Sequence, residues 1–238
     1  MPTPELSVII PVYNEAENID QTVEEITSTL GNDPDRLEIL FVDDGSTDDT
    51  LHRVQAAAEQ FPVVHWLSFD GNYGQASAFD AGLHAAHGRF LATMDGDLQN
   101  DPLDIPELMR HFYSADLVCG YRRRRNDSLV RKISSRIANG VRNWATGDDI
   151  IDVGCSLRIM RRECVERLTL FEGLHRFFPT LIKMEGFRVV QVPVNHRPRI
   201  RGHTKYNISN RLFKSLADLF AILWMQRRRL RYRIRDQH

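Results

Sequence analysis

The sequence has few cysteines, no long apolar run and almost no net charge. Its three cysteines, Cys119, Cys155 and Cys164, are odd in number and lack the spacing of metal ligands. We interpret them as reduced thiols in the core of a cytosolic protein. The longest apolar candidate, residues 216–225, is ten residues long, against the ~20 that span a bilayer. No basic segment followed by an apolar one opens the chain, so we expect no signal peptide.

The formal net charge of −1 conceals an uneven distribution. Residues 197–238 hold 12 Lys and Arg against two Asp and Glu, whereas the preceding part holds 19 against 30. This division predicts an acidic body and a basic tail that meets an anionic surface. We expect no nucleic-acid partner, because the arginine run at 122–125 has no interleaved aromatic residues and the body is acidic.

Strand-like and helix-like segments alternate along the first half of the chain. Four short apolar runs predict strands buried on both faces: residues 6–12, 37–42, 63–67 and 89–94. Helical spacing is found in residues 14–30 and 75–86, and Ser46 and Asp49 have the capping-box spacing of a further helix start. The alternation predicts an α/β fold with a mostly parallel sheet flanked by helices. A later strand is expected at 189–194.

Acidic residues follow three of these strands. The ends carry Tyr13-Asn14-Glu15, Asp43-Asp44 and Asp95-Gly96-Asp97, and ligands bind at the carboxyl ends of strands in such sheets. Hard divalent cations take oxygen ligands and are often completed by substrate phosphates. Asp95, Asp97 and the Gln99 carbonyl therefore make a candidate half-site for a metal bound to a diphosphate, with Gly96 allowing the backbone to turn.

The remaining strand-end residues suit a nucleotide. Tyr13 can stack on a base, and Asp44 can accept an N–H from a base edge. Glu15 and Asp43 either contact ribose or hold the loops together. Local alternatives exist for several of them, since acidic and amide residues also begin helices and form turns.

Several ordered segments resemble a known family. VIIPVYNEAENI, ILFVDDGSTDDT, NYGQASAFDAGLHAAHG and MDGDLQNDP resemble the hallmark segments of family 2 glycosyltransferases, which have the GT-A fold. The later GYRRRRNDSLVRKISSRIAN, DVGCSLRIMRRE and RPRIRGHTKY resemble the dolichol-phosphate mannose synthase branch, which includes bacterial polyprenyl-phosphate glycosyltransferases. The resemblance runs over about residues 6–206.

The resemblance implies a role for each matching residue. The nucleotide of a sugar donor would contact Pro11, Tyr13, Glu15, Asp44 and Asp95. Mg²⁺ or Mn²⁺ would be held by Asp97 and Gln99. The acceptor phosphate would be bound by Arg122 and Arg136, and Arg199 and Lys205 would close over the diphosphate or that phosphate. Three weaker candidates are Asp152, which would shape the acceptor loop or orient an arginine, and the pair His175 and Arg176.

The expected function is that of an inverting, metal-assisted glycosyltransferase. It would move a hexose-type sugar from a GDP- or UDP-linked donor to a polyprenyl (dolichyl or undecaprenyl) phosphate. A phosphate acceptor arrives already ionised and needs no general base, whereas its charge must be neutralised by cations. One alternative acceptor is a saccharide hydroxyl on a cell-surface glycan, with Asp152 as the candidate base. Another alternative is a nucleotide-sugar-binding protein without turnover.

The C-terminal part suggests a membrane contact. We expect a catalytic domain over 1–206 and an amphipathic, basic helical tail over 207–238. A helix with an apolar face and a basic end is typical of the membrane interface, and a helix docked on the body is the alternative. The expected location is the cytoplasmic face of a membrane, where the protein would be peripheral. A separate membrane-spanning protein is a further candidate partner.

Overall fold

The computed structural model describes residues 3–123, 139–166, 168, 173–198 and 209–228. Its strands form one sheet in the order β3-β2-β1-β4-β6-β5-β7. β6 is antiparallel to β4 and β5, and the other neighbouring strands are parallel. The strands are β1 (Leu6–Val12), β2 (Leu37–Asp43), β3 (Val64–Ser68), β4 (Phe90–Thr93), β5 (Leu117–Arg122), β6 (Arg158–Arg161) and β7 (Val189–Val194).

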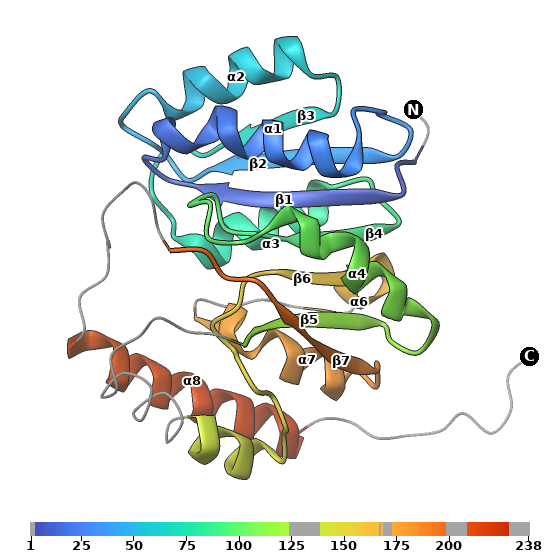
Figure 1. Ribbon diagram of the computed structural model, residues 1–238. Coiled ribbons are helices and arrows are strands. Elements are labelled where there is room, and N and C mark those ends of the chain that lie inside the picture. The colour runs from blue at the N-terminus through green and yellow to red at the C-terminus, as the bar shows by residue number, and fades with distance from the viewer. Residues whose placement is uncertain (1–2, 124–138, 167, 169–172, 199–208, 229–238) are drawn as a thin grey trace, which may run out of the picture.

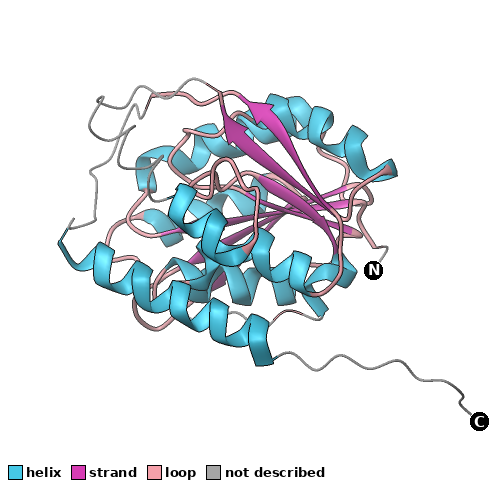
Figure 2. Ribbon diagram, turned by 90° about the horizontal axis from the view of Figure 1, so that it is seen from below, coloured by secondary structure: helices cyan, strands magenta, loops and turns pink. Residues whose placement is uncertain are grey.

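Helices cover both faces of the sheet (Figure 1). In β1, Val8 and Ile10 pack on one face and Ile9 on the other, because successive side chains of a strand alternate. The first face carries α1 (Ile19–Leu30), α2 (Thr50–Gln60) and α4 (Ile105–Met109). The second carries α3 (Gln75–Ala85), α6 (Arg162–Glu166), α7 (Phe178–Met184) and α8 (Ser209–Arg228). Figure 2 shows the twisted sheet enclosed between these layers.

The α/β class with a mostly parallel sheet is confirmed. The expected strands are present with shifts of about one residue, and β7 has the expected bounds. The antiparallel strand β6, whose four residues begin and end with arginine, was not predicted. The capping-box prediction was wrong: Asp49 precedes α2 without a side-chain cap bond, and Ser46 Oγ instead accepts from Asn14 N at 2.9 Å. The Ser46 hydroxyl therefore bonds to the loop after β1, and not to the start of α2 as the local pattern predicted.

Cys119, Cys155 and Cys164 are free and buried, as expected of core thiols. Burial raises the pKa of the Cys119 thiol to about 12 and that of Cys155 to about 11, so both are protonated at neutral pH. No helix within the described residues has both the length and the apolar character to cross a membrane.

Helix α3 lies unusually close to the sheet at Gly82. A Cβ built on Gly82 would be 2.4 Å from Ile9 Cγ2 and 2.9 Å from Val42 Cγ2. The absence of a side chain therefore sets the distance between α3 and strands β1 and β2. The same helix begins at Gln75, so its position also determines where its first residues meet the carboxyl ends of the strands.

We expect Gly82→Ala to lower the free energy of unfolding by about 1–3 kcal/mol, because the methyl group overpacks a filled interface. The matched control is Gly140→Ala, since Gly140 is also helical but has no atom within 4 Å of the added Cβ. That change should be neutral or stabilise by up to about 1 kcal/mol. Urea denaturation of both variants is the measurement, and equal effects would contradict the close-packing argument.

Candidate active site

The loops that follow β1 and β2 are fastened to one another. Asn14 has a φ of 52°, a left-handed conformation that asparagine tolerates better than most residues. Its Oδ1 accepts from Thr47 N at 2.8 Å and from Asp48 N at 3.3 Å. Glu15 N donates to Thr50 Oγ1 at 2.8 Å. These bonds fix the backbone directly after Tyr13 and bring two of the expected nucleotide-contacting loops together.

The residues expected to contact a nucleotide from the first loop are half-buried. Pro11, Tyr13 and Glu15 all retain some exposed surface at this edge of the sheet. Asn18 Nδ2 donates to Glu15 Oε2 at 2.6 Å, so this carboxylate also serves the local helix start. Both of the alternatives considered for Glu15, ligand contact and loop support, remain compatible with its position.

Asp43 and Asp44 differ in their surroundings although they are adjacent. Asp43 is 1% exposed, and its carboxylate accepts from Ser46 N at 3.2 Å and from Ser68 Oγ at 3.0 Å. Asp43 therefore holds the loops together, which is one of the two roles predicted for it; the other was contact with ribose. Asp44 accepts from Tyr73 N at 2.7 Å and from Gly74 N at 2.9 Å. Burial raises the pKa of the Asp44 carboxyl although these backbone donors oppose the shift.

Asp95 follows β4 and contacts the start of α3. Gln75 Nε2 donates to Asp95 Oδ1 at 2.8 Å, and Asp95 N donates to Asn100 Oδ1 at 3.0 Å. Burial, and then the nearby charge of Asp97, raise the pKa of Asp95 to about 6. A hydrogen bond from Ser156 and the charges of two arginines, Arg158 and Arg122, act in the opposite direction. Asp95 thus lies within electrostatic reach of both another carboxylate and cationic side chains.

The turn between Asp97 and Gln99 is made by Leu98, which has a φ of 61°. Gly96, which was expected to let the backbone turn, lies in the bend over residues 96–98 but does not itself have a positive φ. A Cβ on Gly96 would instead be 2.8 Å from Val12 Cγ1, so glycine is needed there for close approach to β1. A leucine in the left-handed region is strained, and such strain is concentrated at functional sites.

Asp97 and Gln99 provide oxygen donors of the kind that Mg²⁺ and Mn²⁺ prefer. Asp97 is 8% exposed, and its Oδ1 accepts from Gln99 N at 3.2 Å. Gln99 Nε2 donates to Arg197 O at 3.4 Å, so the amide nitrogen is engaged by the segment after β7. No group of three His, Cys, Asp or Glu side chains within the described residues is arranged to hold a metal. A cation here would need ligands beyond Asp97 and Gln99, since Mg²⁺ takes six.

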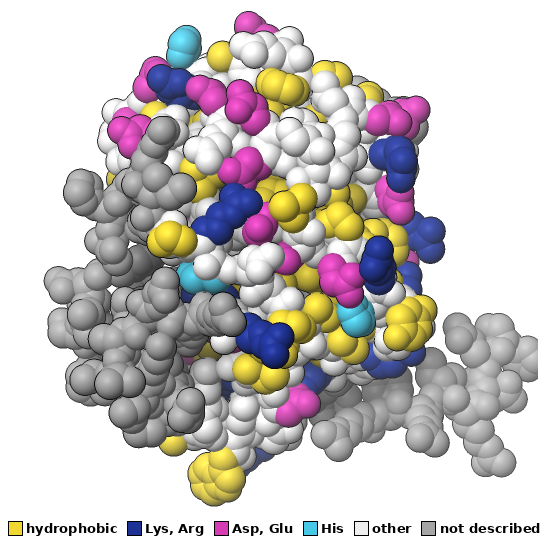
Figure 3. All heavy atoms as spheres, viewed as in Figure 1, with side chains coloured by type: hydrophobic (Ala, Val, Ile, Leu, Met, Phe, Trp, Pro, Cys, Tyr) yellow, Lys and Arg dark blue, Asp and Glu magenta, His cyan; other side chains and the backbone are white. Residues whose placement is uncertain are grey.

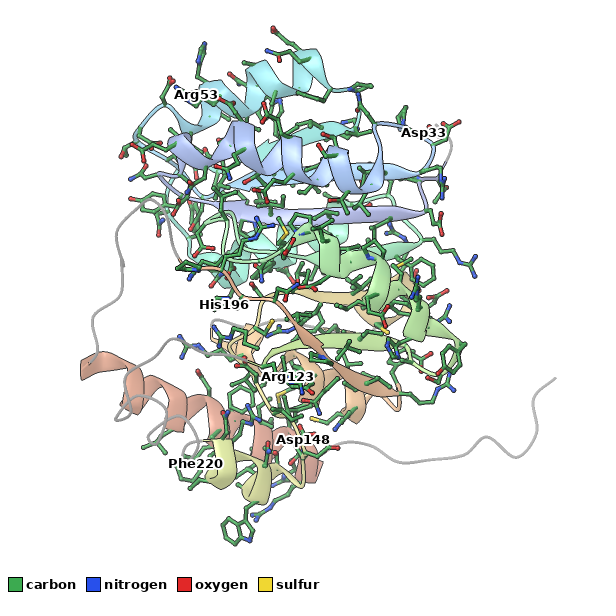
Figure 4. The ribbon with its side chains drawn as sticks, in the orientation of Figure 1. Asp33, Arg53, Arg123, Asp148, His196 and Phe220 are labelled. Carbon is green, nitrogen blue, oxygen red and sulfur yellow. The ribbon has the colours of Figure 1, made fainter. Side chains whose placement is uncertain are left out.

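A segment distant in sequence packs on this turn. His196 forms an isolated bridge with Asn100, and its Nε2 lies 3.5 Å from Gln99 Nε2. Figure 4 shows His196 at the carboxyl end of the sheet. Arg197 forms ion pairs with Glu25 at 2.6 Å and with Asp101 at 2.8 Å, and these two carboxylates raise its pKa. The segment after β7 is thus held against the residues that would bind metal.

Arg122, the last residue of β5, is held by Asp152. Its Nε donates to Asp152 Oδ2 at 2.7 Å and its Nη2 to Asp152 Oδ1 at 2.9 Å, a bidentate pair. Arg122 N and Gly154 N also donate to this carboxylate. A Cβ on Gly154 would be 2.7 Å from Arg122 Nη2, so glycine makes room for the guanidinium. Asp152 orients an arginine, which is one of the two roles considered for it.

The other expected residues are placed less completely. Arg136, Arg199 and Lys205 lie outside the described residues, as does the His175 side chain. Arg176 is half-buried in the 3₁₀ turn Leu174–Phe177. Neighbours of the strand-end carboxylates that were not expected from the sequence are Gln75, Asn100, Ser156, Arg158 and His196. Gln75 and Asn100 lie inside the segments NYGQASAFDAGLHAAHG and MDGDLQNDP, so the family resemblance of these segments could have identified both residues.

The chain matches known proteins over most of its length. A family model described as glycosyl transferase family 2 matches residues 7–169. Dodecaprenyl-phosphate galacturonate synthase of Rhizobium johnstonii is 36% identical over 98% of this chain and 70% of its own length. Undecaprenyl-phosphate 4-deoxy-4-formamido-L-arabinose transferase of Yersinia pestis is 36% identical over 93% of this chain and 68% of its own length.

Solved structures share the fold. A mannosyltransferase from Pyrobaculum calidifontis, in complex with GDP-Man and Mn²⁺, superposes with a TM-score of 0.67 at 23% identity. The superposition covers 92% of this chain and 63% of the mannosyltransferase chain. Glucosyl-3-phosphoglycerate synthase from Mycobacterium tuberculosis, with Mn²⁺, UDP-glucose and phosphoglyceric acid, gives a TM-score of 0.69 at 19% identity over 93% of this chain and 80% of that one. At these identities the likeness establishes the fold.

We expect Asp152→Asn to lower the free energy of unfolding by about 3 kcal/mol, because it leaves the largely buried Arg122 without its countercharge. The control is Glu107→Gln, which breaks an exposed pair with Arg110 at 3.1 Å. An exposed pair contributes less than about 1 kcal/mol. Chemical denaturation measures both, and an Asp152→Asn loss as small as that of the control would show that the pair is weakly coupled to folding.

Proposed function

The chain belongs to glycosyltransferase family 2, and we propose that it transfers a sugar from a nucleoside-diphosphate sugar to a polyprenyl phosphate with inversion at the anomeric carbon. Two relatives at 36% identity are named for transfer to dodecaprenyl and undecaprenyl phosphate. The observation that carries the proposal is the bidentate pair between Arg122 and Asp152. It places a cation near the strand-end carboxylates and occupies the carboxylate that was the candidate base.

The donor would bind along the carboxyl ends of β1, β2 and β4. Tyr13 would stack on the base, Asp44 would accept from its edge, and Pro11 and Glu15 would line the same side. Asp95 would contact the ribose or the phosphates. The support is that the loops bearing these residues are tied together by a hydrogen bond that Asn14 Oδ1 accepts and by bonds that the start of α3 donates, so binding would need little ordering.

Asp97 and Gln99 would hold Mg²⁺ or Mn²⁺ on the donor diphosphate. When bound, such an ion supplies positive charge that stabilises the departing diphosphate. Asp97 contributes a largely buried carboxylate, and Leu98 turns the chain so that Gln99 follows on the same short segment. His196 and Arg197 brace this segment from the side of β7.

Arg122 would bind the acceptor phosphate, together with Arg136, Arg199 and Lys205 from outside the described residues. A polyprenyl phosphate is ionised at neutral pH, so its oxygen can attack without a base. Transfer to a saccharide hydroxyl would need one, and both oxygens of Asp152 already accept hydrogen bonds from Arg122. The arrangement therefore favours the phosphate acceptor.

The acceptor also implies a location. A polyprenyl chain resides in a bilayer, so the protein would associate peripherally with the cytoplasmic face of a membrane, through its tail, 207–238, beyond a catalytic domain over 1–206. Arg227 and Arg228, exposed at the end of α8, suit an anionic leaflet. A separate membrane-spanning partner would be a further way to stay at the surface.

The experiment for the proposed function is a transfer assay. We would first find the donor by a thermal-shift panel of UDP- and GDP-linked sugars with Mn²⁺, since a ligand of the folded state raises its stability. Radiolabelled sugar from that donor should then enter the lipid phase with undecaprenyl phosphate and not with undecaprenol. Asp97→Ala should abolish the transfer, and unchanged transfer in this variant would contradict the metal assignment.

Arg122→Ala should reduce kcat/KM for the acceptor by about 10–100-fold, as expected for losing a charged hydrogen-bond donor, while the thermal shift with the donor persists. The matched control is Arg123→Ala, because Arg123 is the exposed neighbour in the same run (Figure 4). Its effect should stay within about twofold. Loss of donor binding in Arg122→Ala would assign this arginine to the other substrate.

A further inference from the structure

Helix α8 has two apolar faces. Ile222 is fully buried, and Leu219 and Met225 pack beside it against the core cluster of α3 and α7. On the outward side, Leu216, Phe220 and Trp224 are 43%, 69% and 64% exposed. Their four-residue spacing places them in one row along the helix. The helix is therefore docked on the body, which was the alternative to an interfacial helix, and it still presents an exposed apolar row.

A second helical segment lies beside α8. Residues 139–146 are helical, and within them Val141 is 51% and Trp144 is 86% exposed. Gln226 Nε2 donates to Thr146 O at 3.1 Å, which joins the two segments. Figure 1 shows residues 139–146 (yellow-green) next to α8 (red) at the end of the molecule furthest from β3. We call this surface the two-helix face; it consists of Val141, Trp144, Leu216, Phe220 and Trp224.

The two-helix face is poor in acidic groups. Among the described residues of the two segments, 139–147 and 216–228, the one acidic residue is Asp218. Its carboxylate lies against Gly173, where an added Cβ would be 2.5 Å from Oδ2, and is thus directed to the body. Arg227 and Arg228 are exposed at the end of α8. Hydrophobic side chains protrude at this end of the molecule in Figure 3, and Figure 4 shows Phe220 on the side of α8 away from the sheet.

We propose that the two-helix face is the surface that rests on an anionic bilayer, with Trp144 and Trp224 in the headgroup region. Tryptophan is favoured at that depth because its ring is amphipathic, and arginines beside it are attracted to anionic lipids. Contiguous exposed aromatic residues otherwise mark a contact with a protein. The basic flank and the scarcity of carboxylates on the two helices favour lipid. Asp148 and Asp149, which follow helix 139–146, both pair with Lys183. This inference rests on the proposed function, because the acceptor's chain would be in the bilayer.

The face is connected to the acceptor site by a short, fixed segment. From Thr146 to Asp152 the chain can span at most about 22 Å. Asp148 accepts from Thr180 Oγ1 at 2.5 Å and from Lys183 Nζ at 2.7 Å, and Ile151 N donates to Gln191 Oε1 at 2.7 Å. Asp152 in turn holds Arg122. Contact of helix 139–146 with the headgroups would thus limit how far Arg122 lies from the headgroup level, at which the phosphate of a bilayer-embedded acceptor lies.

The chain provides its own probes, since it has three tryptophans. Trp66→Phe/Trp224→Phe leaves Trp144, and Trp66→Phe/Trp144→Phe leaves Trp224. The matched control, Trp144→Phe/Trp224→Phe, leaves Trp66, which is 41% exposed on β3 at the opposite edge of the sheet. With phosphatidylcholine and phosphatidylglycerol vesicles brominated in the acyl chains, fluorescence of Trp144 and Trp224 should be quenched and that of Trp66 should not. Equal quenching of all three, or none, would overturn the proposal.

A second measurement separates this inference from the proposed function. Trp144→Glu/Phe220→Glu should weaken vesicle binding by about tenfold or more, while the thermal shift with the sugar donor is unchanged. If transfer to a short-chain, water-soluble polyprenyl phosphate is observed but vesicles leave the tryptophans unquenched, the face is wrong and the function holds. If vesicles quench Trp144 and Trp224 but no polyprenyl phosphate accepts sugar, the function is wrong and the face does not dock for this reaction.

Discussion

The burial of carboxylates close to one another at the carboxyl end of the sheet is the constraint on which the site depends. The parallel strands β1, β2 and β4 are neighbours, so the acidic residues that follow β2 and β4 are brought to one edge. Each carboxylate has a local donor: Asp44 has the backbone of Tyr73 and Gly74, and Asp95 has Gln75. These donors do not offset burial fully, since burial first and the charge of Asp97 second raise the pKa of Asp95 to about 6. A divalent cation, as proposed for Asp97 and Gln99, would add the positive charge that favours ionised carboxylates.

The arginine side of the site arises from the part of the sheet that departs from the parallel pattern. β5 delivers Arg122 at its carboxyl end, and the chain returns through Asp152 and Gly154 before the antiparallel β6. The ion pair orients the guanidinium and at the same time uses the carboxylate that could have been a base. One contact therefore favours an acceptor that brings its own negative charge over one that must first lose a proton.

Much of this arrangement could be predicted from the sequence, because β-branched runs specify buried strands and acidic residues directly after them must meet at one edge. Asp44, Asp95, Asp97 and Gln99 were identified in this way, and Arg122 by resemblance. The prediction that failed concerns a local hydrogen bond, because Ser46 binds Asn14 rather than capping α2. The left-handed conformation of Leu98 was not predicted from the sequence. Local patterns do not specify which tertiary partner will be present.

Residues that approach the site from distant parts of the chain were harder to identify. His196 follows β7 and reaches Gln99 across 97 positions of sequence, and no short-range pattern encodes such a contact. The same limitation applies to α8, whose apolar residues at helical spacing fit a docked helix and an interfacial one equally well. Burial separates the two, since Ile222 faces the core and Phe220 faces outward. A helix with both faces apolar can join the body to a second surface without a flexible linker.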